Sequence, residues 1–94
     1  MKIIWSPTAV ERISEISEYI AQDNPSAAKK WIDTVFLKVE QITPSHEIGR
    51  IVPEIGSRHF REILYGNYRI MYRVEKEQIS ILNYTPRQAN IADR

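Results

Sequence analysis

Arginine is the residue of this chain best suited to chemistry, because guanidinium groups bind carboxylates and phosphates while staying charged. Four arginines lie close together in the second half, opposed only by Glu62, and they are Arg58, Arg61, Arg69 and Arg73. The formal net charge of the whole chain is only +1, which gives no support for bulk attraction to polyanions. The cluster therefore predicts a local surface that binds an anion or a carboxylate. A strand face with solvated ion pairs is the alternative.

Groups that transfer protons or bind metals are scarce in the sequence. It has no cysteine, and its only histidines are His46 and His59, neither of which has a second ligand at a metal-binding spacing. Glycine-rich phosphate loops, paired-histidine motifs and acyl-transfer elbows are absent as well. We therefore expect no metal and no cofactor. The sequence favours a protein without enzymatic activity but leaves that point open.

The length of 94 residues fits one domain, which we expect to span residues 1–94. No apolar run is long enough for a membrane span, and the N-terminal segment meets Pro7 too early for a secretory signal. The lack of cysteine fits a reducing compartment. These features predict a soluble protein of the cytoplasm.

The first half of the chain predicts a strand followed by two helices. Lys2–Trp5 is a short apolar run, and Ser6-Pro7 then supplies an N-cap and a proline at the first helical position. Asn24-Pro25 repeats this signal after a very short turn. Apolar residues recur three or four positions apart along residues 7–22 and 25–42, so we expect two amphipathic helices that pack as a hairpin.

Alternating apolar and polar residues in the second half predict strands at residues 58–65, 68–74 and 79–84. Gly66-Asn67 joins the first two as a two-residue turn, which pairs Tyr65 with Tyr68 and fixes the register of the hairpin. The predicted order is strand, helix, helix and three antiparallel strands. This is an α+β fold in which the helical hairpin packs on a small antiparallel sheet.

The register divides the side chains of this hairpin between two faces. The apolar face, which we expect to pack on the helices, holds Ile63, Tyr65, Tyr68, Ile70, Tyr72 and Val74. The other face, which we expect to look outward and to bind a partner together with the late Arg87, holds Phe60, Glu62, Leu64, Arg69, Met71 and Arg73. Arg69 is either a surface ion pair with Glu62 or a fixed guanidinium offered to an acidic peptide. In the second case, Arg69→Ala should weaken binding and leave the fold near wild-type stability.

Short signatures follow one another along nearly the whole chain: Ser6-Pro7-x-Ala9, Tyr19-Ile20, Asp23-Asn24-Pro25-x-Ala27-Ala28, Gly49-Arg50, Val52-Pro53-Glu54, Tyr68-Arg69-Ile70-x-Tyr72 and the late Arg87. Their order resembles the RelE/ParE toxin superfamily, and most of all its ParE branch, also known as plasmid-stabilisation proteins. The resemblance implies the toxin of a type II toxin–antitoxin system. It also implies a hetero-oligomer with a cognate antitoxin, which wraps the toxin and itself binds operator DNA.

The two branches of this superfamily imply different activities. RelE-like toxins cleave mRNA on the ribosome, and here Arg61, Arg69 and Arg87 would contact phosphate, with His59 or Tyr84 as acid or base. The segment around Arg61 lacks the lysines of that branch, and no tyrosine follows Arg87. ParE-like toxins instead bind DNA gyrase and block replication, and the resemblance favours this activity. A non-toxic scaffold within the antitoxin's repressor complex is the third alternative.

Overall fold

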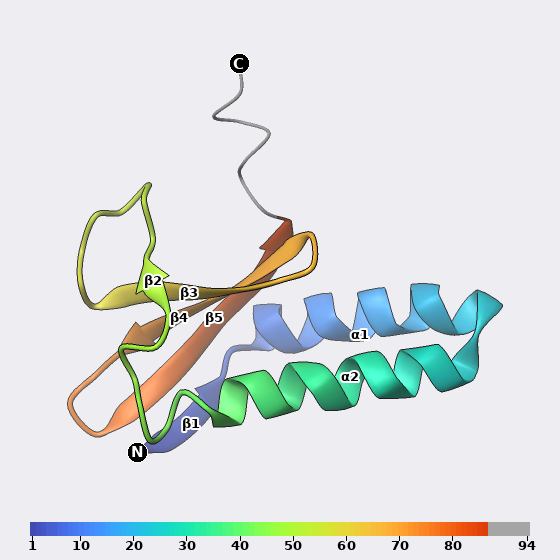
Figure 1. The fold of residues 1–94 in the computed structure, drawn as a ribbon, viewed down its shortest axis with the longest axis horizontal. Helices are drawn as coiled ribbons and strands as arrows, with labels where there is room; N and C mark the ends of the chain where they lie inside the picture. Colours follow the sequence, from blue (N-terminus) through green and yellow to red (C-terminus); the bar gives the residue numbers. More distant parts are fainter. Residues whose placement is uncertain (87–94) are drawn as a thin grey trace.

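The computed structural model of the chain describes residues 1–86, which form two helices and one five-stranded sheet (Figure 1). In chain order the elements are β1 (Lys2–Trp5), α1 (Pro7–Asp23), α2 (Pro25–Glu40), β2 (Arg50–Ile51), β3 (Phe60–Tyr65), β4 (Tyr68–Val74) and β5 (Gln78–Pro86). Figure 1 shows the two helices side by side as a hairpin next to the sheet. Neither helix of this described part is long and apolar enough to cross a membrane.

Both helices begin where the sequence predicts. The Ser6 hydroxyl accepts a hydrogen bond from the Ala9 N–H at 3.0 Å, and the Asn24 side chain accepts one from the Ala27 N–H at 3.0 Å. The Asn24 N–H also donates to the Ile20 carbonyl at 3.0 Å, so this residue ends α1 and begins α2. One asparagine therefore sets the tight turn of the helical hairpin.

The β3–β4 hairpin has the predicted register, in which Tyr65 lies opposite Tyr68 and Glu62 opposite Met71. Gly66 has a φ of +60°, as the first central residue of a type II′ turn requires, and no non-glycine residue of the described part has a positive φ. The strand order is β1-β5-β4-β3-β2. This arrangement confirms the predicted α+β layout.

Two features of the sheet differ from the sequence prediction. The N-terminal strand β1 pairs in parallel with β5, so the sheet is mixed rather than wholly antiparallel. The short strand β2, which the sequence did not predict, pairs with Arg61 and Glu62 at the other edge. Two residues are too few for alternation to be recognised in a sequence.

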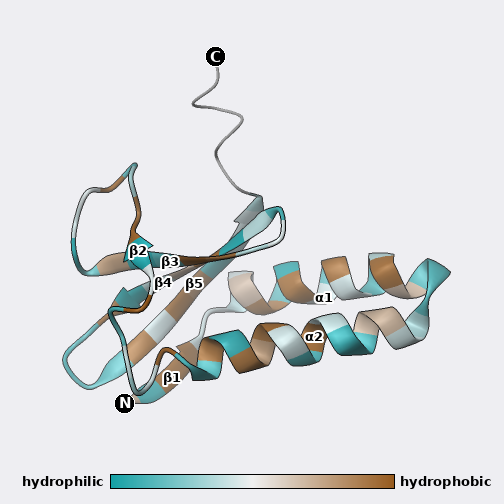
Figure 2. Cartoon of the chain, viewed as in Figure 1, coloured by the Kyte–Doolittle hydropathy of each residue, from teal (hydrophilic) through white to brown (hydrophobic). Residues whose placement is uncertain are grey.

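The core lies between the helical hairpin and one face of the sheet. Figure 2 shows hydrophobic and hydrophilic residues alternating along both helices, as amphipathic helices require. Tyr84 stacks on Tyr68 with ring centroids 5.2 Å apart and meets Trp31 edge to face at 5.6 Å. The buried residues of this core cluster are Ala9, Ile13, Val35, Val39, Ile42, Ile70, Tyr72, Ile79, Ile81 and Tyr84. The prediction that the apolar face packs on the helices is confirmed.

Candidate interaction site

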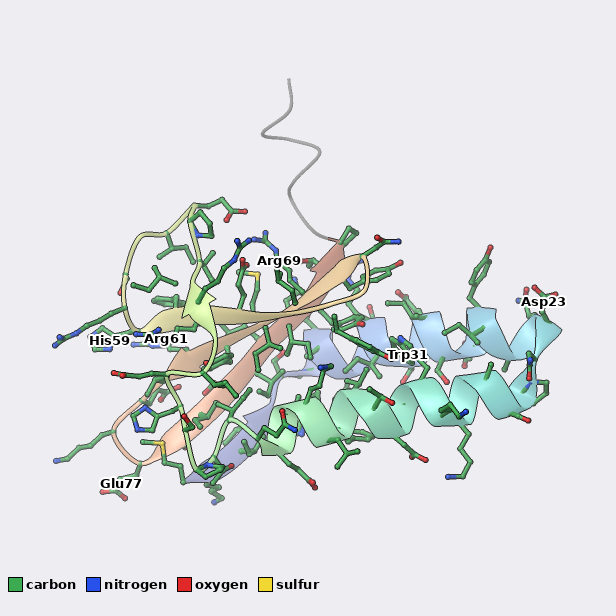
Figure 3. The ribbon with its side chains drawn as sticks, in the orientation of Figure 1. Asp23, Trp31, His59, Arg61, Arg69 and Glu77 are labelled. Atoms are coloured by element: carbon green, nitrogen blue, oxygen red, sulfur yellow. The ribbon has the colours of Figure 1, made fainter. Side chains whose placement is uncertain are left out.

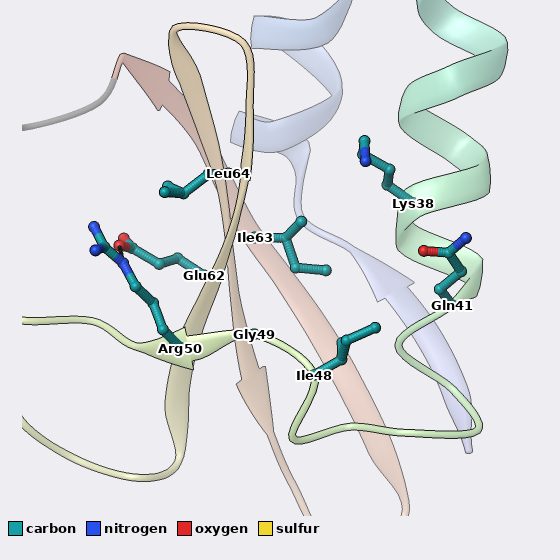
Figure 4. Close-up of a pocket in the computed structure, with 8 residues that line it drawn as sticks. All are labelled: Lys38, Gln41, Ile48, Gly49, Arg50, Glu62, Ile63 and Leu64. Atoms are coloured by element: carbon teal, nitrogen blue, oxygen red, sulfur yellow. Dashed lines mark hydrogen bonds and ion pairs between the residues drawn. The ribbon is translucent and has the colours of Figure 1, made fainter.

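The outer face of the sheet carries a charge network of four side chains: Arg50, Glu54, Glu62 and Arg69. Arg69 donates from Nη1 and Nη2 to the two carboxylate oxygens of Glu54, at 3.1 and 2.8 Å, and from Nη1 to Glu62 at 2.9 Å. The Nε of Arg50 donates to the other oxygen of Glu62 at 2.6 Å, and Figure 4 shows these two side chains together at the sheet edge. Two cations and two carboxylates therefore alternate along one connected network.

Different parts of the chain bring these four residues together. Glu62 and Arg69 come from β3 and β4, whose register places both on the same face in neighbouring positions. Arg50 comes from β2, directly opposite Glu62. Glu54 comes from the loop after β2, which is anchored by the buried Val52, whose carbonyl accepts hydrogen bonds from Ile55 and Gly56. This loop folds back so that Glu54 covers Arg69.

Burial separates the inner pair of the network from its outer pair. The side chain of Glu62 is fully buried and that of Arg69 is only 7% exposed, whereas Arg50 and Glu54 are 58% and 48% exposed. The hydrogen bonds from Arg69 lower the pKa of the Glu54 carboxyl, and those to Glu54 and Glu62 raise the pKa of Arg69 against the opposing effect of desolvation. The Arg69 Nε also donates to the Thr85 hydroxyl at 3.2 Å. All three guanidinium nitrogens of Arg69 thus donate hydrogen bonds within the chain.

The expectation that this whole face looks outward is therefore wrong for Glu62 and Arg69. Alternation along the strands assigned them to the correct face, but the loop carrying Glu54 covers them. Arg73 is exposed and lies over the Phe60 ring at 5.5 Å, and Leu64 and Met71 are partly exposed. Arg87 lies outside the described residues. Whether any of these side chains contacts a partner stays a prediction.

The structure separates Arg61 from Arg69, which the nuclease alternative would need in one site. Arg61 lies opposite Tyr72 on the face of the sheet that points to the core, whereas Arg69 lies on the outer face. Figure 3 shows Arg61 beside His59 and away from Arg69. Arg61 also donates to the backbone carbonyls of Gly49 and Arg58, at 2.9 and 3.2 Å. Its guanidinium has an evident structural role.

The two candidates for proton transfer, His59 and Tyr84, differ in their exposure. Tyr84 is 1% exposed, and its burial raises the pKa of the hydroxyl well above the ordinary range. A residue buried in the core cannot reach an RNA substrate. His59 is exposed, and His46 contributes its backbone carbonyl to Tyr72 at 2.9 Å. No group of three or more His, Asp or Glu side chains in residues 1–86 could hold a metal ion.

Gly49 joins the loop after α2 to the sheet at a very close approach. Its N–H donates to the Tyr72 hydroxyl at 2.9 Å, and a Cβ at this position would lie 2.7 Å from both that hydroxyl oxygen and the Glu62 carbonyl. The Tyr72 hydroxyl in turn donates to the His46 carbonyl. Only glycine fits here, which explains why β2 can begin directly beside Glu62.

A second exposed feature is an apolar groove on the helical hairpin, with a volume of about 280 Å³. It lies beside the edge-to-face pair of Trp5 and Phe36, whose ring centroids are 5.3 Å apart. Half of the Val10 surface and 44% of the Phe36 surface are exposed there. The groove is lined by Trp5, Val10, Ile13, Ser14, Ile32 and Phe36. Such a surface suits the apolar side chains of a bound protein segment.

Comparisons with known proteins agree on the kind of domain. A solved structure described as the chromosomal ParDE TA system from P. aeruginosa has the same fold, with a TM-score of 0.73 and 19% sequence identity, over 92% of this chain and 95% of that chain. Among curated protein sequences, none matches significantly. The family model for the ParE toxin of the type II toxin–antitoxin system parDE matches residues 3–84. Because this match spans most of its length, the chain belongs to the ParE toxin family.

Proposed function

We propose that this chain is a cytoplasmic toxin that binds DNA gyrase, blocks replication and is neutralised by a cognate antitoxin. The observation that carries this proposal is the family match over residues 3–84. The antitoxin forms a hetero-oligomer with the toxin, and DNA is contacted only through the antitoxin. The toxin acts by binding and has no catalytic step.

The geometry of the described residues supports a binding mechanism over catalysis. Of the arginines that a nuclease would use, Arg61 and Arg69 lie within the described residues, and they occupy opposite faces of the sheet. Tyr84 lies in the core. A reaction at the RNA backbone needs a phosphate-binding group and a proton acceptor at one point. Exposed apolar side chains on the helical hairpin and on the outer sheet face instead provide the area that a protein partner buries.

The antitoxin covers the groove on the helical hairpin and the exposed part of the outer sheet face in this proposal. Phe60, Leu64, Met71 and Arg73 provide the outer-face contacts, since Glu62 and Arg69 are already paired. The stacked Arg73 and Phe60 resemble the arginine and aromatic anchors that dominate many protein interfaces. Arg69 then contributes by holding the face in shape.

Induction of this chain alone in a bacterial host tests the toxin assignment. We expect viable counts to fall, gyrase–DNA cleavage complexes to accumulate, and both effects to disappear when the product of the neighbouring gene is co-induced. Unchanged viability would contradict toxicity and favour the scaffold alternative. Cuts at ribosomal A sites, detected by toeprinting on translating ribosomes, would instead favour the mRNA nuclease.

A further inference from the structure

The sheet has an incompletely covered edge where β3 extends beyond β2. β2 pairs only with Arg61 and Glu62, whereas β3 continues to Tyr65. In the β3–β4 hairpin, Tyr65 and Tyr68 are register partners across the two-residue turn, and the Val74 N–H donates to the His59 carbonyl. Because hydrogen-bonding direction alternates along a strand, the odd-numbered residues bond toward β4 and the backbone groups of Leu64 point away from it. The Val52 N–H donates to the Phe60 carbonyl, which confirms that the backbone groups of the even-numbered residues of β3 point toward the β2 edge of the sheet. Within residues 1–86, β4 pairs with Leu64 on one side and no strand pairs with it on the other.

This edge opens into a cleft with a volume of about 320 Å³ between β3 and the end of α2. Figure 4 shows Ile63 pointing toward α2 and Leu64 pointing to the opposite side of β3. Ile48, from the loop after α2, is 51% exposed beside the same opening. The cleft therefore has apolar walls on both sides of a strand edge that offers one N–H donor and one carbonyl acceptor.

Positive charge lies at this cleft on both sides of β3. Lys38, from the last turn of α2, is half-buried with its ammonium 5.3 Å from the Tyr65 ring centroid, and it forms no ion pair within the described residues. Arg50 uses its Nε for Glu62 and leaves 58% of its side chain exposed. The buried Glu62 is already shared between Arg50 and Arg69. The cations that a bound ligand can reach are thus Lys38 and Arg50.

We propose that this cleft binds an extended acidic peptide segment of the antitoxin, which adds as a strand beside Leu64. Side chains alternate between the two faces of an added strand, so one set meets Ile63, Ile48 and Lys38 while the other meets Leu64 and Arg50. Apolar residues pack on the two walls, and carboxylates pair with the two cations. The identity of the partner rests on the proposed function, but the chemistry of the segment follows from the cleft.

Two pairs of variants test the strand edge and the charge separately. Leu64→Pro removes an N–H that the sheet does not use, and Leu64→Val keeps it, so the pair isolates the edge hydrogen bond. Lys38→Glu reverses a charge at the cleft, and Lys30→Glu makes the same change on α2 about 12 Å farther along the helix. Binding is measured by calorimetry with the purified product of the neighbouring gene. Amide hydrogen exchange by NMR follows Leu64 in the free chain and in the complex.

We expect Leu64→Pro and Lys38→Glu each to weaken the complex by about tenfold or more, with both controls near wild type. The Leu64 amide should exchange freely in the unbound chain and become protected in the complex. Equal effects of Lys38→Glu and Lys30→Glu, or a Leu64 amide that stays unprotected in the complex, would overturn the proposal. The amide measurement uses the unaltered chain and stays decisive if Leu64→Pro fails to fold. Protection of Leu64 in the free chain that rises with concentration would assign the edge to a second copy and also overturn the proposal.

The docking site and the proposed function fail in different ways. If the complex protects the Leu64 amide but the chain does not inhibit growth, the toxin function is refuted and the peptide-binding cleft is supported. If the chain inhibits growth but the complex leaves the Leu64 amide unprotected, the toxin function is supported and the peptide-binding cleft is refuted. If the neighbouring product does not bind, a synthetic peptide that alternates glutamate and valine is the probe. NMR shifts at Leu64, Ile48 and Lys38 would then support the cleft, and shifts elsewhere or none would refute it.

Discussion

The guanidinium of Arg69 donates two hydrogen bonds, of 3.1 and 2.8 Å, to the carboxylate of Glu54. Arg69 lies on β4, whereas Glu54 lies in the loop after β2, 15 positions earlier in the chain. This contact places the loop after β2 over the centre of the outer sheet face. It neutralises the cation that the sequence offers most prominently to an acidic partner. The outer face is therefore less basic than its arginines alone suggest, and Arg69 stabilises the face instead of projecting from it.

Arg69→Ala should destabilise the fold by about 3 kcal/mol, because it removes one cation from the fully buried Glu62 and leaves Arg50 as that carboxylate's only ion-pair partner. This replaces the sequence-based expectation that the fold would stay near wild-type stability. Urea unfolding measures the difference. Arg73→Ala, on the same strand and face but exposed, serves as the matched control and should cost less than about 1 kcal/mol. Equal stability of the two variants would show that the buried network contributes little.

Glu54→Gln should reduce stability near neutral pH by less than about 1 kcal/mol, because solvent screens a carboxylate that is 48% exposed. The folded pKa of Glu54 is lowered from its ordinary value of 4.5, so its contribution is present above that pH and is lost as the pH falls through the folded pKa. Unfolding of both proteins at neutral and acid pH measures this effect. The stability difference should vanish in acid, and a difference that stays constant with pH would contradict the Arg69 contact.

Removing the hydroxyl of Tyr72 and that of Tyr84 should have different effects on the stability of the fold. Tyr72→Phe removes a group that bonds both the Gly49 N–H and the His46 carbonyl, and we expect a loss of about 1 to 3 kcal/mol. Tyr84→Phe removes a buried hydroxyl that makes no hydrogen bond of good geometry within residues 1–86 and has only a weak polar contact with the Trp31 side chain, so stability should stay the same or rise. Thermal and urea unfolding measure both.

Tyr84→Phe also bears on mechanism, because this hydroxyl is one of the two groups, with His59, that the nuclease alternative would use as acid or base. We expect growth inhibition by this variant to equal that of the wild type. Loss of growth inhibition in a variant of normal stability would indicate a chemical role for Tyr84 and contradict a binding mechanism.

Local signals in the sequence were sufficient for the helical hairpin and the β3–β4 register. Ser6 and Asn24 cap the helices through contacts three residues away, and Gly66 sets the turn through its own φ. Such interactions depend on neighbours in the chain and are visible in the sequence. The same alternation correctly placed Tyr72 in the core and Arg69 on the other face.

What the sequence could not predict depends on segments that meet from far apart. Alternation tells which face a side chain occupies but not what covers that face, so the burial of Arg69 by Glu54 was missed. The parallel pairing of β1 with β5 joins the two ends of the described chain, and no local pattern encodes it. One signal was available for the network: Glu62, an acidic residue within an otherwise apolar and basic strand, requires a cation if it is buried.

A supercoiling assay with purified gyrase, relaxed plasmid and a saturating amount of this chain tests directly whether the toxin inhibits gyrase. We expect that supercoiling stops, that cleaved DNA trapped by gyrase accumulates, and that prior addition of the cognate antitoxin restores normal activity. Supercoiling at the uninhibited rate, with no trapped cleavage, would contradict gyrase inhibition by this chain.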